Sequence, residues 1–276
     1  MGNLKIGLQL YSVRDDMAQD MYAALKKVKE IGYDYVEFAG YFDHSAEEVR
    51  SMLDEIGLTC VSVHQAYNLF LEEGQKAADY LKTIGADYAA IPWMAAEDHK
   101  GCDHYDNVIA DITKVGRLLK DNGIQLLYHN HDFEFQKFED KFLLDWLYES
   151  VPSDLLQTEV DTCWVKYAGY DPCEYLKKYT GRSPVVHLKD FTCKRFAGGP
   201  AYALIDENGK EIKTTREDNG FEFRPVGMGL QDFPAILKAA EEAGAAYAIV
   251  EQDASVDRPP MEAAKLSREY LKKIGY

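Results

Sequence analysis

Two histidines stand two residues apart in segment 126–135, which reads LLYHNHDFEF. In an extended strand, residues i and i+2 point to the same face, so His129 and His131 are predicted to share the face of Leu127. Imidazole rings accept protons near neutral pH and ligate metals. If this face turns toward the interior of a barrel, the pair is suited to one of these two tasks.

Other titratable side chains stand at the ends of short β-rich runs. They are Glu37, His64, Glu159, Asp161, His187, Lys189, Glu251 and Asp253. Strand alternation turns Asp161, His187 and Glu251 to the inner face. Buried carboxylates and imidazoles are costly unless they are paired or bind a metal, and this mixture of donors suits Mn, Zn, Co, Fe(II) or Mg. The sequence therefore predicts one divalent metal ion, with a metal-free network of buried ions as the alternative.

A repeated unit explains how these residues could meet. An amphipathic helical pattern, a glycine and a β-rich run recur, as in EIGYDYVEF, EIGLTCVSV and EAGAAYAIV. Glycine just after a helical pattern is typical of a helix C-terminus. Eight strands are predicted, at 5–11, 35–39, 60–65, 88–93, 125–131, 156–161, 184–189 and 247–252. Helical patterns separate them, although those near 69–84 and 142–150 are weak.

Alternating strands and helices predict a parallel sheet, and eight units fit a single-domain (β/α)8 TIM barrel spanning residues 1–276. A doubly wound open sheet is the rival, but the first strand lacks the glycine-rich turn typical of that fold. The catalytic residues of a TIM barrel lie at the carboxyl ends of its strands. This is where the polar side chains above are predicted to converge.

An insertion of about 34 residues, 191–224, follows the seventh predicted strand. Its segment DENGKE is typical of a hairpin turn, so we expect a hairpin-like lid over the catalytic face. Arg195, Arg216 and Arg224 could bind a phosphate or carboxylate there, or could be solvated charges. The segment VGMGL that follows could form an anion site at a helix N-terminus.

Composition narrows the class of partner. The chain has 276 residues and a net charge of −16, which disfavours nucleic acid and anionic membranes. Its five cysteines are scattered without a CxxC motif, as expected for reduced thiols, and no 18-residue apolar segment occurs. We therefore expect a cytoplasmic protein that binds a small molecule, and a homo-oligomer is compatible with this type of barrel.

The chain resembles the sugar phosphate isomerase/epimerase family of the xylose isomerase-like TIM-barrel superfamily. The motifs that carry the resemblance are YHNHDFEF, EVDTCWVKYAGYDP, VVHLKDF and PVGMGLQDF. Members typically hold one divalent metal (Mn, Zn, Co or Mg here) by a Glu, an Asp, a His and a Glu on successive strands. The resemblance implies Asp161, His187 and Glu251 as ligands. His129 stands where the family has its first Glu, and Glu134 or Glu159 could serve instead.

The resemblance also implies a reaction. A metal-dependent isomerase or epimerase would take a proton from a ketose or keto-sugar, which could be phosphorylated, to give an enediolate. His131 is the leading candidate for the catalytic base, with Glu251 and Lys189 as the other catalytic residues. Because His129 replaces one of the two family glutamates, a lyase that acts on a 3-keto-glycoside or inosose, with the same metal and base, is the alternative.

Two further functions stay open. One is a barrel that binds a sugar without catalysis. The other is an endonuclease IV-like enzyme, which needs more metal ligands and a DNA-binding face, against the negative charge of this chain.

The predicted substrate-binding residues each have a structural alternative. Lys189 could steady the enediolate, and His64 could contact substrate or be a hydrogen-bonded core ring. Glu37 could contact substrate or pair with Arg14. Trp93 and Trp164 could form a wall on which a sugar stacks, or could belong to the core.

Overall fold

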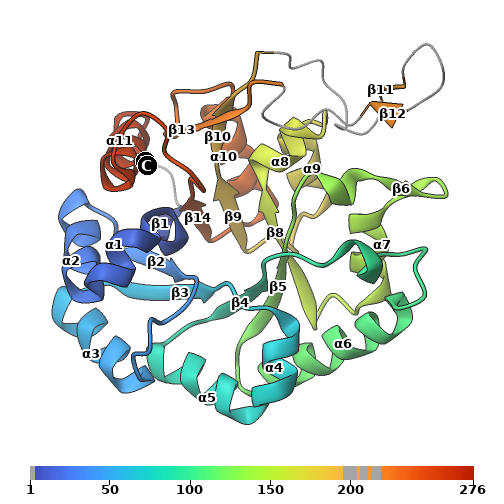
Figure 1. The fold of residues 1–276 in the computed structure, drawn as a ribbon, viewed down its shortest axis with the longest axis horizontal. Coiled ribbons are helices and arrows are strands. Elements are labelled where there is room, and N and C mark those ends of the chain that lie inside the picture. Colours follow the sequence, from blue (N-terminus) through green and yellow to red (C-terminus); the bar gives the residue numbers. More distant parts are fainter. Residues whose placement is uncertain (1–3, 195–203, 206–210, 213–218) are drawn as a thin grey trace.

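Eight parallel strands form the centre of the computed structural model, which describes residues 4–194, 204–205, 211–212 and 219–276 (Figure 1). They are β1 (Lys5–Gln9), β2 (Tyr35–Phe38), β3 (Thr59–Val63), β4 (Tyr88–Ile91), β5 (Gln125–His129), β8 (Leu156–Asp161), β9 (Val185–Leu188) and β14 (Tyr247–Val250). Their order in the sheet is β3-β2-β1-β14-β9-β8-β5-β4. A bridge between His64 and Ala90 joins β3 to β4, so the barrel is nearly closed. The predicted (β/α)8 barrel is confirmed.

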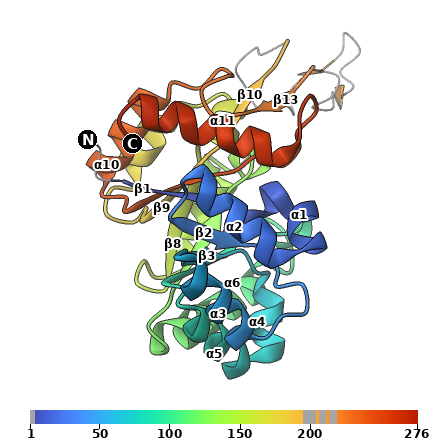
Figure 2. The same ribbon diagram turned by 90° about the vertical axis from the view of Figure 1, so that its left-hand side faces the viewer.

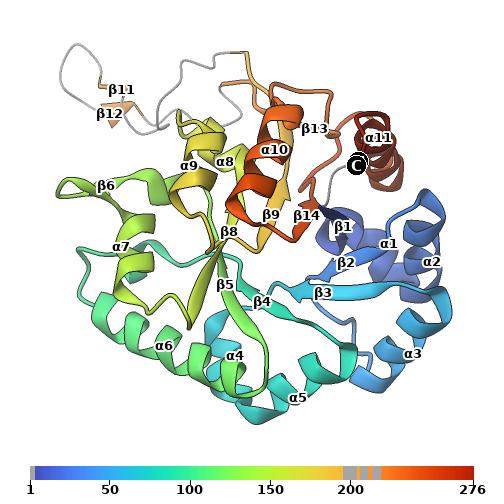
Figure 3. The ribbon, with the colours of Figure 1, turned by 180° about the vertical axis from the view of Figure 1, so that it is seen from behind.

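Helices surround the strands (Figures 1 and 2). They are α1 (Arg14–Gln19), α2 (Met21–Ile31), α3 (Ala46–Ile56), α4 (Tyr67–Glu73), α5 (Gln75–Ile84), α6 (Tyr105–Asp121), α7 (Leu143–Ser150), α8 (Thr162–Tyr167), α9 (Pro172–Lys178), α10 (Phe233–Ala243) and α11 (Pro260–Lys273). Helices α9 and α10 pack side by side (Figure 3). The two weak helical patterns are helices in the structure: α4 and α5 cover the first, and α7 covers the second. Among the described residues, no helix is both long and apolar enough to cross a membrane.

Local sequence signals set the helix ends. Helix α3 begins at a capping box, in which the Ser45 side chain accepts from the Glu48 backbone and Glu48 accepts from the Ser45 backbone. It ends at Gly57, whose φ of 78° is the left-handed conformation that glycine adopts at little cost. Such ends return the chain to the next strand within a few residues.

The strands alternate as predicted. Leu127, Val185 and Ile249 belong to a small apolar cluster inside the barrel. Their neighbours on the strands, Leu126 and Val186 among them, belong to the large core between strands and helices. The residue two positions later on each strand also points into the barrel, one layer nearer the carboxyl ends of the strands. These residues are His129, His187 and Glu251, and they form a polar layer above the apolar one.

Several strands end earlier than predicted, which corrects one argument about the histidines. Strand β5 stops at His129, so His131 lies beyond the strand and the same-face argument does not apply to it. The intervening Asn130 does not continue the strand pairing. Its side-chain oxygen accepts from the Asp161 backbone N–H at 2.9 Å, and its amide donates to the Asp161 carbonyl at 3.3 Å.

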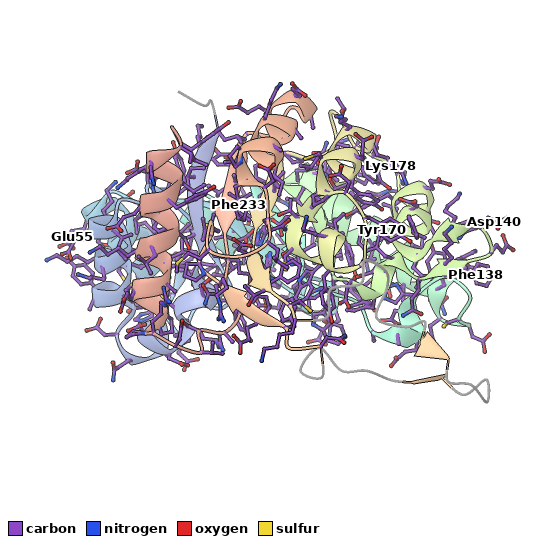
Figure 4. The ribbon with its side chains drawn as sticks, turned by 90° about the horizontal axis from the view of Figure 1, so that it is seen from above. Glu55, Phe138, Asp140, Tyr170, Lys178 and Phe233 are labelled. Atoms are coloured by element: carbon purple, nitrogen blue, oxygen red, sulfur yellow. The ribbon has the colours of Figure 1, made fainter. Side chains whose placement is uncertain are left out.

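The insertion begins as an antiparallel pair, β10 (Asp190–Thr192) with β13 (Glu222–Arg224). Farther out, β11 (Leu204–Ile205) pairs with β12 (Glu211–Ile212), as expected on either side of a hairpin turn. The turn itself lies outside the described residues, and so do Arg195 and Arg216 on either side of this hairpin. The lid therefore stays a prediction. Arg224 pairs with Glu222, as solvated charges would. A second small hairpin, β6 (Lys137–Phe138) and β7 (Lys141–Phe142), carries Asp140 at the far end of the molecule from Glu55 on α3 (Figure 4).

The VGMGL segment wraps around a carboxylate of the protein itself. The buried Asp190 side chain accepts from the backbone N–H groups of Phe191 (2.9 Å), Gly227 (3.0 Å), Gly229 (2.8 Å) and Gln231 (3.2 Å). A Cβ atom added at Gly229 would lie 2.3 Å from Asp190 Oδ1, so only glycine fits there. The segment is therefore occupied from within, and the anion site suggested by its sequence is wrong.

Replacing Asp190 with alanine is expected to lower the free energy of unfolding by about 3–5 kcal/mol, because four backbone donors lose their buried acceptor. Urea unfolding followed by circular dichroism measures this loss. Asp232→Ala, which removes only the N-cap of α10, is the matched control and should cost about 1 kcal/mol. Equal losses in the two variants would contradict the role assigned to Asp190.

Candidate active site

A cavity of about 1270 Å³ opens at the carboxyl ends of the barrel strands. Six of the predicted site residues line it: His64, Trp93, His129, His131, Lys189 and Glu251. Glu37, Asp161, Trp164 and His187 are fully buried. The barrel therefore gathers the predicted site residues at one end, with part of the set at the cavity surface and part directly behind it.

The four residues predicted to bind metal form one cluster. His129, Asp161, His187 and Glu251 each offer a ligand atom, and these atoms lie within 4.8 Å of one another. His129 Nε2 is 3.6 Å from Asp161 Oδ2, and His187 Nδ1 is 2.8 Å from Glu251 Oε2. Asp161 Oδ2 is buried and accepts no hydrogen bond among the described residues, and its contacts are the ion pairs with His129 and Lys189. Two imidazoles and two carboxylates in this arrangement fit a divalent transition metal.

The cluster is held in place by the backbone around Asp161. Its Oδ1 atom caps helix α8 by accepting from the N–H groups of Cys163 (2.8 Å) and Trp164 (3.0 Å). The Asn130 side chain clamps the Asp161 backbone from the neighbouring strand. Oδ1 is thereby committed to the helix, and Oδ2 is left for the cluster.

A second layer of carboxylates lies on the other side of the two histidines. Glu159 Oε2 is 3.2 Å from His129 Nδ1, and Glu37 Oε2 is 2.7 Å from His187 Nε2. His129 therefore directs Nδ1 to Glu159 and Nε2 toward Asp161. In the same way, His187 directs Nε2 to Glu37 and Nδ1 to Glu251. This is the usual way in which proteins fix the orientation of histidines that bind a metal. His64, 2.7 Å from Glu159, completes this inner layer.

An overlapping group of His64, His129, Glu159 and His187 could also hold a metal ion. It would use the nitrogens that face the inner layer. The inner layer already has internal partners, since Gln9 donates to Glu37 at 2.8 Å and His64 lies against Glu159. The outer group, which lies on the side of the cavity-lining Glu251 and Lys189, is therefore the candidate metal site, with the inner group as the residues that would orient it.

Burial and neighbouring charges separate the pKa values of the cluster. Burial, and next the charge of His187, lowers the pKa of His129 to about 3, so this ring is neutral. Burial raises the pKa of Asp161 to about 6. Burial opposes a charge on His187, but Glu159 and Glu37 outweigh it and raise its pKa well above the ordinary value. His187 is thus the charged ring of the pair while no metal is bound, and it would have to release this proton to act as a ligand.

Lys189 is a buried ammonium surrounded by carboxylates. Its Nζ atom lies 3.0 Å from Glu251 Oε2, 3.0 Å from Asp253 Oδ1 and 3.3 Å from Asp161 Oδ2. Burial would lower the pKa of Lys189, but Asp253, Glu251 and Asp161 raise it well above its ordinary value. Lys189 is therefore protonated at neutral pH and can supply a positive charge or a proton.

His131 lines the cavity between aromatic rings. It stacks on Trp164, with centroids 5.6 Å apart, and on Phe133 at 5.4 Å, and its ring lies 5.4 Å from that of His129. The buried Glu134 accepts from the His131 backbone N–H at 2.8 Å and from the Tyr128 hydroxyl at 2.6 Å. The loop that presents His131 is thus fixed by a carboxyl group beneath it.

Glu134 gives this loop a dependence on pH. Burial raises the pKa of Glu134 from 4.5 to about 8, so the folded state keeps its proton at pH values where the unfolded chain has lost it. The stabilisation is complete below the unfolded pKa and is lost as pH rises toward 8. Between pH 5 and 8, wild type is expected to lose about 3 kcal/mol more unfolding free energy than Glu134→Gln. Urea titrations at the two pH values test this. Glu149→Gln, on the exposed face of α7, should behave as wild type, and parallel losses in all three proteins would refute the assignment.

Two interpretations from the sequence change. Trp164 is fully buried between His131 and Phe221, and it backs the predicted base instead of facing the cavity. Glu37 pairs with His187 and Gln9, whereas Arg14 donates to the backbone carbonyls of Tyr11 and Asp253. The sequence reasoning missed Gln9 and Asn130, although both stand at strand ends beside residues that it did select.

Comparisons with known proteins agree with this architecture. A family model described as "Xylose isomerase-like TIM barrel" matches residues 25–274. An inosose dehydratase of Geobacillus kaustophilus is 25% identical over 94% of this chain and 88% of its own. Clostridial inosose dehydratases match between 60% and 66% of this chain, but little more than half of their own length.

Solved structures share the fold. A sugar phosphate isomerase/epimerase from Parabacteroides distasonis superposes with a TM-score of 0.78 at 22% identity, over 100% of this chain and 96% of that one. The IOLI protein, described with a bound zinc atom, superposes with a TM-score of 0.68 at 14% identity, over 98% of each chain.

Proposed function

Because this chain belongs to the xylose isomerase-like TIM-barrel family, we propose that it is a metal-dependent lyase that acts on a keto-sugar or keto-polyol. It would remove the proton beside the ketone and expel the substituent on the next carbon. The observation that carries this proposal is the lining of the cavity. His129 and His131 lie at the end of β5, Glu251 and Asp253 follow β14, and the Lys189 ammonium is held by the two acids.

The donor set supports one divalent ion, held by His129, Asp161, His187 and Glu251. Once bound, it would polarise the ketone oxygen and acidify the neighbouring C–H group. Zinc in a structurally similar barrel is compatible with this set, as are Mn and Co.

The protein itself supplies the acid and the base. Lys189 carries its proton at neutral pH and cannot accept another. Burial would raise the pKa of Glu251, but Lys189 and His187 hold it well below the usual range, and a carboxylate of such low pKa is a weak base. His131 remains as the base for the C–H proton. Lys189 Nζ would stabilise the charge that develops on the substrate oxygen, and a positioned base contributes about 10²–10⁴-fold to the rate.

Elimination fits these groups better than epimerisation. Epimerisation by two carboxylates needs one carboxyl group on each face of the substrate. In this chain, His129 stands where the family has the first of these two glutamates. Elimination needs one base and one proton donor. The relatives named inosose dehydratase catalyse, by that name, the loss of water from an inosose, which is a reaction of this type. Isomerisation or epimerisation is the second candidate: return of the proton to the neighbouring carbon would give isomerisation, and return of a proton to the opposite face of the same carbon would give epimerisation.

The test is to incubate the protein, loaded with Mn, Zn or Co, in D₂O with an inosose, a ketose and a ketose phosphate. Elimination predicts a conjugated ketone with ultraviolet absorption and loss of the β-substituent in the NMR spectrum. A rearranged sugar that carries solvent deuterium would favour the isomerase. If no substrate exchanges a proton with the solvent, whichever metal is bound, the barrel binds its ligand without catalysis.

A further inference from the structure

The cavity is larger than one sugar ring requires. Pockets that enclose a whole drug-sized ligand measure roughly 300–1,000 Å³, and this cavity reaches about 1270 Å³. It continues from the metal cluster over the loop after β2 and along α4 and α5, with lining residues 39–47, Leu69, Lys76 and Tyr80. Helices α3 and α5 lie side by side there, on the opposite side of the barrel from β11 and β12 (Figures 1 and 3). We call this part of the cavity the side cleft.

The rim of the cavity is unusually apolar for exposed surface. Seven large hydrophobic side chains are exposed among the described residues. Four of them line this cavity: Tyr11 (41% exposed), Phe42 (39%), Leu69 (43%) and Trp93 (55%). Exposed apolar groups gathered in one concave place are a mark of ligand binding, whereas scattered ones need no explanation. Flat rings of this kind bind the apolar face of another ring.

The loop that carries Phe42 is held in a costly conformation. Phe42 and Asp43 have φ angles of 50° and 63°, a region that side chains other than glycine rarely adopt. Such strain concentrates at ligand-binding positions, where the surrounding structure compensates for it. Here Tyr80 donates to the His44 carbonyl at 2.8 Å and packs against Tyr41, with ring centroids 4.2 Å apart and the rings tilted by 35°.

The charges in the side cleft disfavour a phosphate as its occupant. Asp43, Glu47, Glu73 and Asp79 line the cavity together with Lys76, whereas the other lysine that lines it, Lys189, lies at the metal cluster and is paired with acids there. Carboxylates accept hydrogen bonds from hydroxyl groups and repel phosphate. Aromatic faces together with carboxylates suit a neutral, hydroxylated ring.

We propose that the side cleft is a subsite for a second sugar ring, and that the substrate is an unphosphorylated 3-keto-glycoside; this rests on the proposed lyase function. The keto ring would occupy the metal cluster, and the second ring would lie against Trp93. The base takes the proton from C2, its bonding electrons form the C1=C2 double bond, the C1–O bond breaks, and the departing oxygen gains a proton. The products are an unsaturated ketone and the free second sugar, so no co-reactant is needed.

The experiment compares three substrates: a 3-keto-disaccharide, the methyl 3-keto-glucoside and an inosose. The quantity measured is the ratio of kcat/KM for the disaccharide to that for the methyl glycoside. We expect wild type to prefer the disaccharide by about tenfold, and Trp93→Ala to lower the ratio about five- to tenfold. Trp93→Phe should retain most of the preference. Leu230→Ala, an exposed apolar residue outside the cavity, should leave the ratio unchanged.

Failure of the two proposals would look different. A ratio near one in wild type, or a ratio that Trp93→Ala does not change, would overturn the subsite while leaving the lyase in place. If no substrate reacts, the lyase proposal fails. Saturation-transfer NMR with the unoxidised disaccharide then tests the subsite alone. Magnetisation transfer from the protein to both rings, with the transfer to the second ring lost in Trp93→Ala, would support the subsite. The absence of any transfer would overturn it.

Discussion

Replacing Asp161 with asparagine is expected to abolish tight binding of a divalent metal and to lower kcat/KM by about 10³-fold or more. Asparagine keeps an oxygen at the Oδ1 position, which caps α8, but puts an amide nitrogen in place of the Oδ2 ligand. The change therefore removes a ligand while leaving the helix cap in place. Calorimetric titration with Mn or Zn measures the affinity, and far-ultraviolet circular dichroism confirms the fold.

The chain provides a matched control. Asp171 caps α9 in the same way, by accepting from the Cys173 N–H at 2.8 Å, and it is not part of the metal cluster. Asp171→Asn should bind metal and turn over as wild type does. If Asp161→Asn binds metal with unchanged affinity, the outer cluster is not the metal site, and the inner group of His64, His129, Glu159 and His187 would be the one to test next.

Replacing His131 with alanine is expected to lower kcat by about 10²–10⁴-fold while the metal content stays unchanged. His131 is not a member of the metal cluster, so its loss removes a base without removing a ligand. The variant also leaves space between Phe133 and Trp164, and added imidazole should recover part of the activity. Proton exchange of the substrate in D₂O, followed by NMR, measures the step directly.

The control for this variant is His104→Ala, an exposed histidine at the start of α6 and away from the cavity. It should exchange protons at the wild-type rate. Full exchange in His131→Ala would place the base elsewhere. Glu251 would then be the first alternative, because Lys189 is held in its protonated form.

The barrel and much of its active site follow from patterns within single segments. Alternation along β8 and β9 is enough to turn Asp161 and His187 inward, and the apolar layer of Val185 and Ile249 confirms this register. Glycine at helix ends, as at Gly57, marks where each strand resumes. Such signals are local, because they depend only on the backbone geometry of neighbouring residues.

Contacts between distant segments decide the rest. Strand β5 ends at His129 because Asn130 bonds with the backbone of Asp161, 31 residues away, and no periodic pattern reveals this. The orientation of His187 depends on Glu37, which is 150 residues earlier. The side cleft depends on the left-handed conformations of Phe42 and Asp43, which their residue types do not predict.

The most direct test of the account is the metal content of the purified protein after reconstitution with Mn, Zn or Co, measured by elemental mass spectrometry beside Asp161→Asn. We expect about one equivalent in wild type and nearly none in the variant, because the ion would be held by His129, Asp161, His187 and Glu251. Wild type that stays empty with all three metals would contradict it, and the buried histidines and carboxylates would then be a metal-free ion network.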